Sequence, residues 1–66
     1  MKIKVIIDGK KRVLNYKKGM KIVDLARENK IVLSNYIVIV NGNIVPEDEI
    51  VKDKDKIEFL KIASGG

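Results

Sequence analysis

The chain has only 66 residues, and nineteen of them are isoleucine or valine. β-Branched side chains of this kind favour the pleated, half-buried surface of a sheet. The chain contains no cysteine and no histidine, so neither disulfides nor the usual zinc ligands can hold so small a domain together. A chain of this length buries about 60% of its unfolded surface, and its stability is marginal. We therefore expect one small, strand-rich domain that is stabilised by packing alone.

Alternating apolar residues predict a β-hairpin at the start of the chain. In residues 2 to 7, Ile3, Val5 and Ile7 recur with period two and form the inward set. Asp8-Gly9 is typical of a two-residue hairpin turn, and residues 11 to 16 are expected to form the returning strand.

The next segment predicts one short amphipathic helix that runs to Asn29. Its apolar residues recur at helical spacing: Met20, Ile22, Val23, Leu25 and Ala26. Gly19 is expected as a weak N-cap, and Lys21 in the first turn opposes the helix dipole. Tertiary packing must therefore supply most of the stability of this helix.

A second hairpin and a final strand complete the expected sheet. Asn41-Gly42 is a strong signal for a type I′ turn, and Pro46 ends the strand that follows it. Residues 30 to 36 are expected to form a connection that leads to a strand at residues 37 to 40. The turn at residues 41 to 42 leads into a short strand at residues 44 to 45. A charged loop at residues 47 to 56 then precedes the final strand at residues 57 to 62.

The final strand predicts an exposed apolar strip. Ile57 and Phe59 share one face of it, whereas Glu58, Leu60 and Ile62 share the other. One helix covers one face of a sheet, so the face with Glu58 should be the solvent face although it carries two large aliphatic side chains. Exposed patches of this kind often mark partner surfaces, and we expect Leu60 and Ile62 to contact a partner. The alternative is that loop 30 to 36 or loop 46 to 56 folds over the strip.

The sequence ends in Ala63-Ser64-Gly65-Gly66. Glycine lacks Cβ and tolerates any φ, so a diglycine end suits threading into a narrow active site. An extended segment of four residues reaches about 13 Å beyond the last strand. We interpret residues 1 to 62 as the folded domain and residues 63 to 66 as a flexible tail. For the small residues Ala63 and Ser64, simple disorder is an alternative to a role in threading.

Composition argues against several classes of partner. The net charge is +5, but aromatic residues are few and no nucleic-acid-binding motif is present, so we do not expect nucleic acid to bind. The longest apolar run, residues 37 to 40, is far shorter than the roughly 20 residues of a membrane span, and the start of the chain lacks a secretory signal. We therefore expect a cytoplasmic protein without a membrane partner.

The order of the elements, together with the diglycine end, resembles the ubiquitin-like β-grasp fold. The resemblance covers the whole chain, and its most specific parts are residues 40 to 46 (VNGNIVP) and residues 55 to 59 (DKIEF) running into the diglycine. The chain is similar to the sulfur-carrier family that includes ThiS and MoaD, and is closer to ThiS. This likeness implies an α+β fold, with a mixed sheet of four to five strands and one main helix packed on one face.

The resemblance also implies a function. A ubiquitin-activating-type adenylating enzyme would use ATP and Mg to adenylate Gly66, and a sulfur donor would convert the acyl group to a thiocarboxylate. Sulfur would then pass to a downstream synthase or other acceptor in thiamine thiazole, related cofactor or tRNA biosynthesis. The chain itself would be a covalent carrier without catalytic side chains, bound metal or bound cofactor.

The same resemblance assigns roles to residues near the end of the chain. Gly65, Ser64 and Ala63 would thread into the partner's active site. The ubiquitin-like alignment adds Ile39 to the outer docking face with Leu60 and Ile62, with core packing as the alternative for Ile39. Two other functions stay open, a ubiquitin-like modifier that is conjugated to lysines and a non-covalent β-grasp interaction module.

Overall fold

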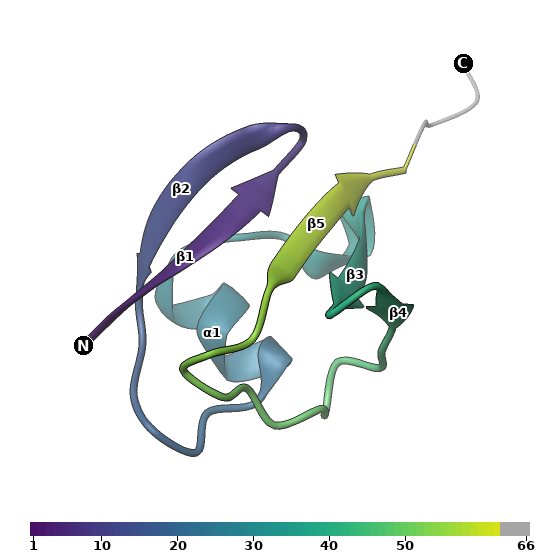
Figure 1. Ribbon diagram of the computed structural model, residues 1–66. Helices are drawn as coiled ribbons and strands as arrows, with labels where there is room; N and C mark the ends of the chain where they lie inside the picture. Colours follow the sequence, from purple (N-terminus) through teal and green to yellow (C-terminus); the bar gives the residue numbers. More distant parts are fainter. Residues whose placement is uncertain (63–66) are drawn as a thin grey trace.

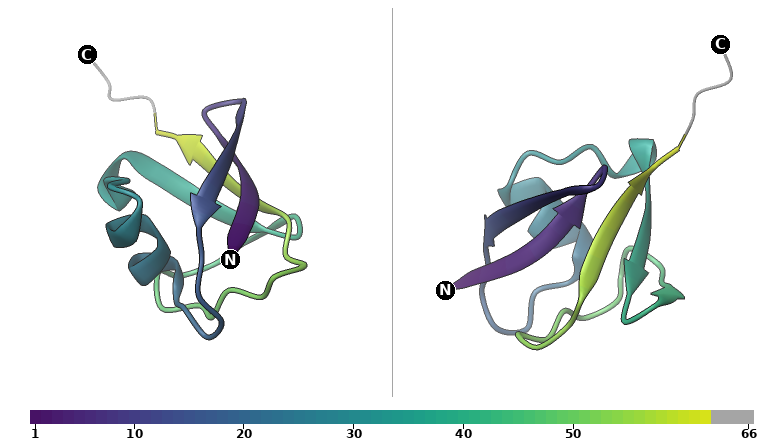
Figure 2. Two further views of the ribbon diagram at one scale, coloured as in Figure 1. Left: turned by 90° about the vertical axis from the view of Figure 1, so that its left-hand side faces the viewer. Right: turned by 45° about the horizontal axis from the view of Figure 1, so that its top comes forward.

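The structure, a computed structural model, describes residues 1 to 62. These residues form a five-stranded mixed sheet and one α-helix (Figure 1). The elements follow in chain order: β1 (Lys2–Ile7), β2 (Lys10–Asn15), α1 (Ile22–Glu28), the 3-10 turn η1 (Leu33–Asn35), β3 (Tyr36–Val40), β4 (Asn43–Ile44) and β5 (Ile57–Lys61). The strand order is β2-β1-β5-β3-β4, with β1 and β5 parallel and the other neighbours antiparallel. The helix lies against one face of the sheet (Figure 2). The expected α+β, β-grasp architecture is confirmed.

Both hairpin turns have the backbone that their sequences predict. A type I′ turn needs positive φ at both central residues, which asparagine, aspartate and glycine tolerate best. The φ angles are 51° and 79° at Asp8 and Gly9, and 53° and 84° at Asn41 and Gly42. Local turn chemistry therefore fixes the register of both hairpins.

The helix begins later than its apolar pattern predicts, so the expected N-cap at Gly19 is wrong. The N-cap is Lys21, whose side chain has no acceptor to offer the first turn. The free N–H groups of that turn bond instead to carbonyls of the loop after β4: Ile22 to Glu49 at 2.9 Å and Val23 to Glu47 at 2.8 Å. A distant loop thus satisfies two N–H groups of the helix start, and the Asp24 side chain accepts a further hydrogen bond from the Lys21 N–H at 3.2 Å.

The segment between β4 and β5 is more than a charged loop. Val51 is buried in it, and its carbonyl accepts a hydrogen bond of 2.8 Å from the hydroxyl of the buried Tyr16. Ile50 forms an isolated β-bridge with Lys21 at the start of the helix. The segment therefore closes the end of the core beside α1.

The core lies between α1 and the inner face of the sheet. Its buried members come from every strand but β4, from α1 and from the adjoining loops: Ile3, Val5, Leu14, Tyr16, Ile22, Leu25, Ala26, Val38, Val40, Val51, Ile57 and Phe59. Phe59 is fully buried and meets Tyr36 edge to face, with ring centroids 6.1 Å apart. The inward positions expected from parity are confirmed, except that Ile7 is only partly buried.

Candidate functional site

Strand β5 carries the chain from the core to the C-terminal tail. It lies between β1 and β3. Asp8, the residue after β1, donates its backbone N–H to the Phe59 carbonyl at 2.9 Å. After the strand, the Ile62 N–H donates to the carbonyl of Asn35 at 2.9 Å. This bond anchors the last described residue. The predicted tail residues lie outside the described residues: Ala63, Ser64, Gly65 and Gly66.

The outer face of the sheet, opposite α1, exposes the predicted side chains at the end of β5. Leu60 is 45% exposed and Ile62 is 46% exposed. Ile39 lies on the same outer face, directly opposite Glu58 in the register of β3 and β5, and is half-buried. The structure therefore brings the three predicted docking residues onto one face of the sheet, next to the end of β5.

Two further aliphatic residues of this face were missed by the sequence interpretation. Ile37 lies directly opposite Leu60, and Ile44 lies directly opposite Ile39. Their side chains are 36% and 75% exposed. The parity of the all-apolar strand contained the signal for Ile37, but the strand order is needed to place it. We call these five residues the apolar strip: Ile37, Ile39, Ile44, Leu60 and Ile62.

No segment of residues 1 to 62 covers the apolar strip. Ile37, Ile44, Leu60 and Ile62 all remain exposed, although both candidate loops are present in the structure. The loop after β4 packs instead at the end of the core, through Val51. The alternative that a loop folds over the strip is therefore wrong.

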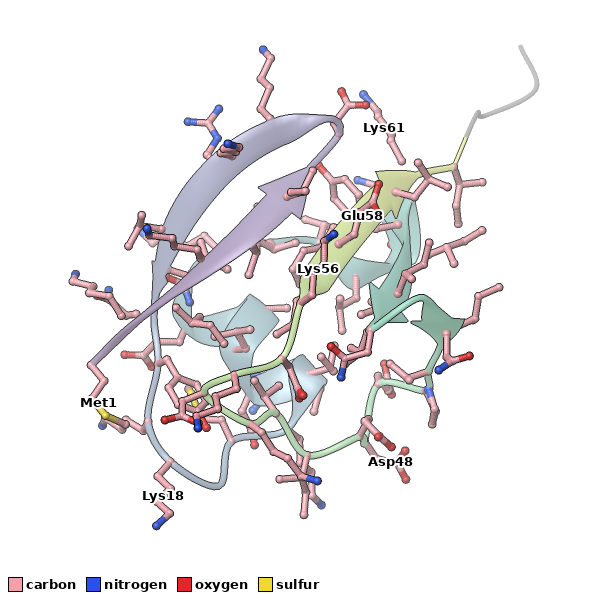
Figure 3. All side chains as sticks on the ribbon, in the orientation of Figure 1. Met1, Lys18, Asp48, Lys56, Glu58 and Lys61 are labelled. Atoms are coloured by element: carbon pink, nitrogen blue, oxygen red, sulfur yellow. The ribbon has the colours of Figure 1, made fainter. Side chains whose placement is uncertain are left out.

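A charged side chain borders the strip on the outer face. Glu58 is half-buried between Ile6 of β1 and Ile39 of β3 in the sheet register (Figure 3). Lys61 is exposed near the end of β5, but it has the inward parity of Ile57 and Phe59. An apolar strip that is edged by charge is typical of a surface that contacts another protein.

Metal-ligand clusters and membrane-spanning helices are absent from the described part of the chain. The chain has no histidine or cysteine, and the acidic side chains of residues 1 to 62 form no group of three that could hold a metal ion. The same residues include no helix with the length and apolarity to cross a membrane. The apolar strip is the candidate contact surface next to the end of β5.

Comparisons with known proteins agree with this fold and with the diglycine end. The model of the ThiS family matches residues 5–66, from β1 to the final glycine. The chain is also similar to the NMR solution structure of a thiamine biosynthesis protein from Geobacter metallireducens, with a TM-score of 0.59. The two chains are 25% identical, and the match covers 97% of this chain and 88% of that one. Because the family match takes in both the β-grasp domain and the diglycine, the chain belongs to the ThiS family.

Proposed function

We propose that the chain is a sulfur carrier protein of thiamine thiazole biosynthesis, or of a related cofactor or tRNA pathway, and that Gly66 carries the sulfur. The single observation that supports this most strongly is the ThiS-family match that runs through the whole domain to Gly66. Proteins of this family are small carriers that work with adenylating enzymes and sulfur-transfer partners. The similar structure from Geobacter metallireducens is described as a thiamine biosynthesis protein, which supports the pathway.

The chemistry requires activation of a chain-terminal carboxylate. With a pKa of about 3.5, this group is ionised at neutral pH and is a poor electrophile. In the proposed reaction, a carboxylate oxygen of Gly66 bonds to the α-phosphorus of ATP and pyrophosphate leaves. A donor then delivers sulfur at the sulfide oxidation level to the carbonyl carbon, and AMP leaves. The product is a thiocarboxylate that passes its sulfur to a downstream synthase or acceptor.

The folded domain contributes position and contact rather than catalysis. Its last anchor is the bond from Ile62 to Asn35, and four extended residues reach about 13 Å from there. That length delivers Gly66 into a nucleotide site that the adenylating enzyme forms with its own Mg and ATP. Gly65, Ser64 and Ala63 are small enough to thread, and the apolar strip binds the surface of the same enzyme.

The position of Gly66 provides the test. One added residue moves the reactive carbon by about 3.3 Å, and misplacement by about 1 Å can cost on the order of a hundredfold in rate. Appending Ala after Gly66, or deleting Gly66, should abolish pyrophosphate exchange with a purified adenylating enzyme of the ThiS-partner type. Gly65→Val should be nearly as damaging because a β-branched side chain fills the path, whereas Ser64→Ala is the matched control that should retain exchange. Equal exchange by the extended and native chains would contradict the proposal.

Mass spectrometry of the protein from its native host distinguishes the carrier from a protein modifier. Replacement of one carboxylate oxygen of Gly66 by sulfur supports the carrier and shows that Gly66 is the mature end. Gly-Gly remnants on lysines of other proteins, without the thiocarboxylate, would support conjugation instead. A chain that shows neither state would favour a non-covalent interaction module.

A further inference from the structure

The positive charge of this chain is concentrated in its first 18 residues, which are the N-terminal hairpin and the turn that follows it. Residues 1 to 18 contain seven lysines and arginines but a single acidic residue, Asp8. The other 48 residues contain seven basic and eight acidic residues. The first 18 residues therefore account for the excess of positive charge, and the remainder of the chain is close to neutral.

The fold gathers part of this charge around one groove. Lys4 on β1, Lys11 and Arg12 on β2, and Lys56 just before β5 line a hollow of about 380 Å³. Figure 3 shows the Lys56 side chain at the seam between β1 and β5. The cations come from three separate parts of the sequence, so the composition of the chain alone does not reveal the cluster.

Aliphatic side chains lie among these cations. Ile6 and Val13 line the same hollow, and Val13 is 60% exposed in the middle of β2. In the register of the hairpin, Val13 lies directly opposite Lys4 and Ile6 lies directly opposite Lys11. Cationic and apolar positions thus alternate across the outer face of the hairpin, beside the apolar strip. Arg12 lies opposite the buried Val5, so it has the inward parity and borders the groove from the exposed edge strand β2. We call this feature the basic groove.

The cations of the basic groove have no acidic partner within the domain. Among residues 1 to 62, the ion pair within 4.0 Å is Arg27–Asp24, on the helix. Glu58 lies opposite Ile6 in the parallel register of β1 and β5, and is the acidic residue on the outer face of these neighbouring strands. Clustered like charges repel one another and destabilise a small domain, so a partner that neutralises them would be favoured.

We propose that the basic groove binds an acidic segment of a partner protein, with an apolar side chain over Ile6 and Val13 and carboxylates toward the outward-facing Lys4, Lys11 and Lys56. Charge complementarity selects the acidic segment, and the exposed aliphatic floor selects a peptide with an apolar anchor. Nucleic acid fits less well because stacking needs exposed aromatic rings. Tyr16 and Phe59 are buried, and Tyr36 is half-buried against Phe59 and does not line the hollow. This site does not depend on the chemistry proposed at Gly66.

The test is a titration of the isotopically labelled full chain, followed by NMR at low salt. The probe is a short, blocked peptide of Glu and Asp with one central Leu. Saturable shifts are expected at the amides of Lys4, Ile6, Lys11 and Val13. Affinity should fall as salt shortens the screening length from about 10 Å at 0.1 M to about 3 Å at 1 M. A peptide with Ser in place of Leu should bind more weakly.

Two double variants with the same change in charge provide the matched comparison. Lys11→Glu with Arg12→Glu should weaken peptide binding about tenfold or more, because it replaces attraction by repulsion at the groove. Lys17→Glu with Lys18→Glu reverses two charges beyond the end of β2, where Figure 3 shows Lys18 far from Lys56, and should change the affinity by less than about threefold. Both variants should retain dispersed amide spectra because all four side chains are exposed.

Three results would overturn the proposal. Equal losses in the two double variants would mean that the peptide responds to net charge and not to the groove. Tighter binding of a single-stranded RNA oligomer of equal charge, lost in the Lys11→Glu and Arg12→Glu variant, would assign the groove to nucleic acid. Absence of saturable peptide binding at low salt would show that the groove does not take acidic segments.

Discussion

At the scale of single residues, Asn29 joins the helix to the sheet. Its Oδ1 accepts a hydrogen bond of 2.9 Å from the Asn15 N–H, and its Nδ2 donates to the Asn15 carbonyl at 3.0 Å. The same Nδ2 donates to the carbonyl of Leu25 at 2.8 Å, at the end of α1. The helical pattern places Asn29 only as the last residue of the helix. Its role as a link to β2 depends on a contact that periodicity does not contain.

We expect Asn29→Ala to lower the free energy of unfolding by about 2 kcal/mol, because it removes three hydrogen bonds that each contribute roughly 0.5 to 1.5 kcal/mol net. Urea unfolding measures the loss. Asn35→Ala, at an exposed side chain, is the matched control and should cost less than about 0.5 kcal/mol. Equal losses in the two variants would show that the Asn29 side chain does not stabilise the contact with β2.

Neighbouring residues of β5 should differ sharply in their contribution to stability. Phe59 is fully buried, whereas Leu60 is 45% exposed on the opposite face. Phe59→Ala should cost about 3 to 5 kcal/mol, a large share of the 5 to 15 kcal/mol that stabilises a typical domain. Leu60→Ala should cost about 1 kcal/mol or less. A similar melting temperature for Phe59→Ala and the native chain would place the core on the other face of β5.

At the scale of the elements, local chemistry explains what the sequence predicts well. The two hairpins are predictable because Asp8-Gly9 and Asn41-Gly42 determine their turns without help from distant residues. The start of the helix is not predictable in this way, since the acceptors of its N–H groups include the distant carbonyls of Glu47 and Glu49. Burial of Val51 is also missed, because two adjacent apolar residues in a charged segment, Ile50 and Val51, show no periodicity that tells which of them is buried.

The candidate site shows the same division. Parity within β5 places Leu60 and Ile62 on the outer face, and the structure leaves both exposed. Ile44 joins them only through the pairing of β4 with β3, a non-local feature of the sheet. The basic groove is likewise hidden from the sequence, because it combines side chains from β1, β2 and the residue before β5. Their roles in binding remain predictions.

We expect the apolar strip to be required for binding and not for folding. Replacing Leu60 and Ile62 together by Ser should leave the amide spectrum of the domain dispersed, because neither residue is buried. The double variant should weaken association with the adenylating enzyme about tenfold or more, since central apolar contacts often contribute over 1 kcal/mol each. Isothermal titration measures this affinity.

Val32→Ser is the matched control for this experiment. Val32 is 59% exposed, yet it precedes η1 and is not part of the apolar strip. Its substitution should leave binding to the adenylating enzyme unchanged. Unfolding of the Leu60 and Ile62 double variant would assign these residues to the core, and unchanged binding would place the docking surface elsewhere.

At the scale of the whole molecule, β5 separates stability from contact. Its inner side chains, Ile57 and Phe59, complete the core, and its outer side chain Leu60 belongs to the apolar strip. In the sequence, the diglycine follows four residues after its end. Alternate residues of one strand therefore have different environments. One set packs in the core, and the other set faces solvent on the outer face of the sheet. This arrangement lets so small a domain expose the apolar strip without opening its core.

The same separation predicts that the last four residues can be removed without loss of the fold. Among the described residues, the buried core ends at Phe59, and the last backbone anchor is the Ile62 N–H on the Asn35 carbonyl. The free energy of unfolding of a chain of residues 1 to 62 should therefore differ from that of the full chain by less than about 0.5 kcal/mol. This corresponds to a shift of less than about 4 °C in melting temperature. The same truncation should abolish pyrophosphate exchange, because it removes the proposed acceptor of AMP.

The control for this truncation removes one residue more. A chain of residues 1 to 61 also loses the hydrogen bond to Asn35, and should be less stable than residues 1 to 62 by about 1 kcal/mol. Thermal unfolding of the three chains by circular dichroism measures both steps. If removal of residues 63 to 66 alone cost more than about 1 kcal/mol, those residues would belong to the folded domain. Their proposed role as a separate arm that carries Gly66 to the nucleotide would then be wrong, because an arm that stabilises the domain has to detach from it before it can react.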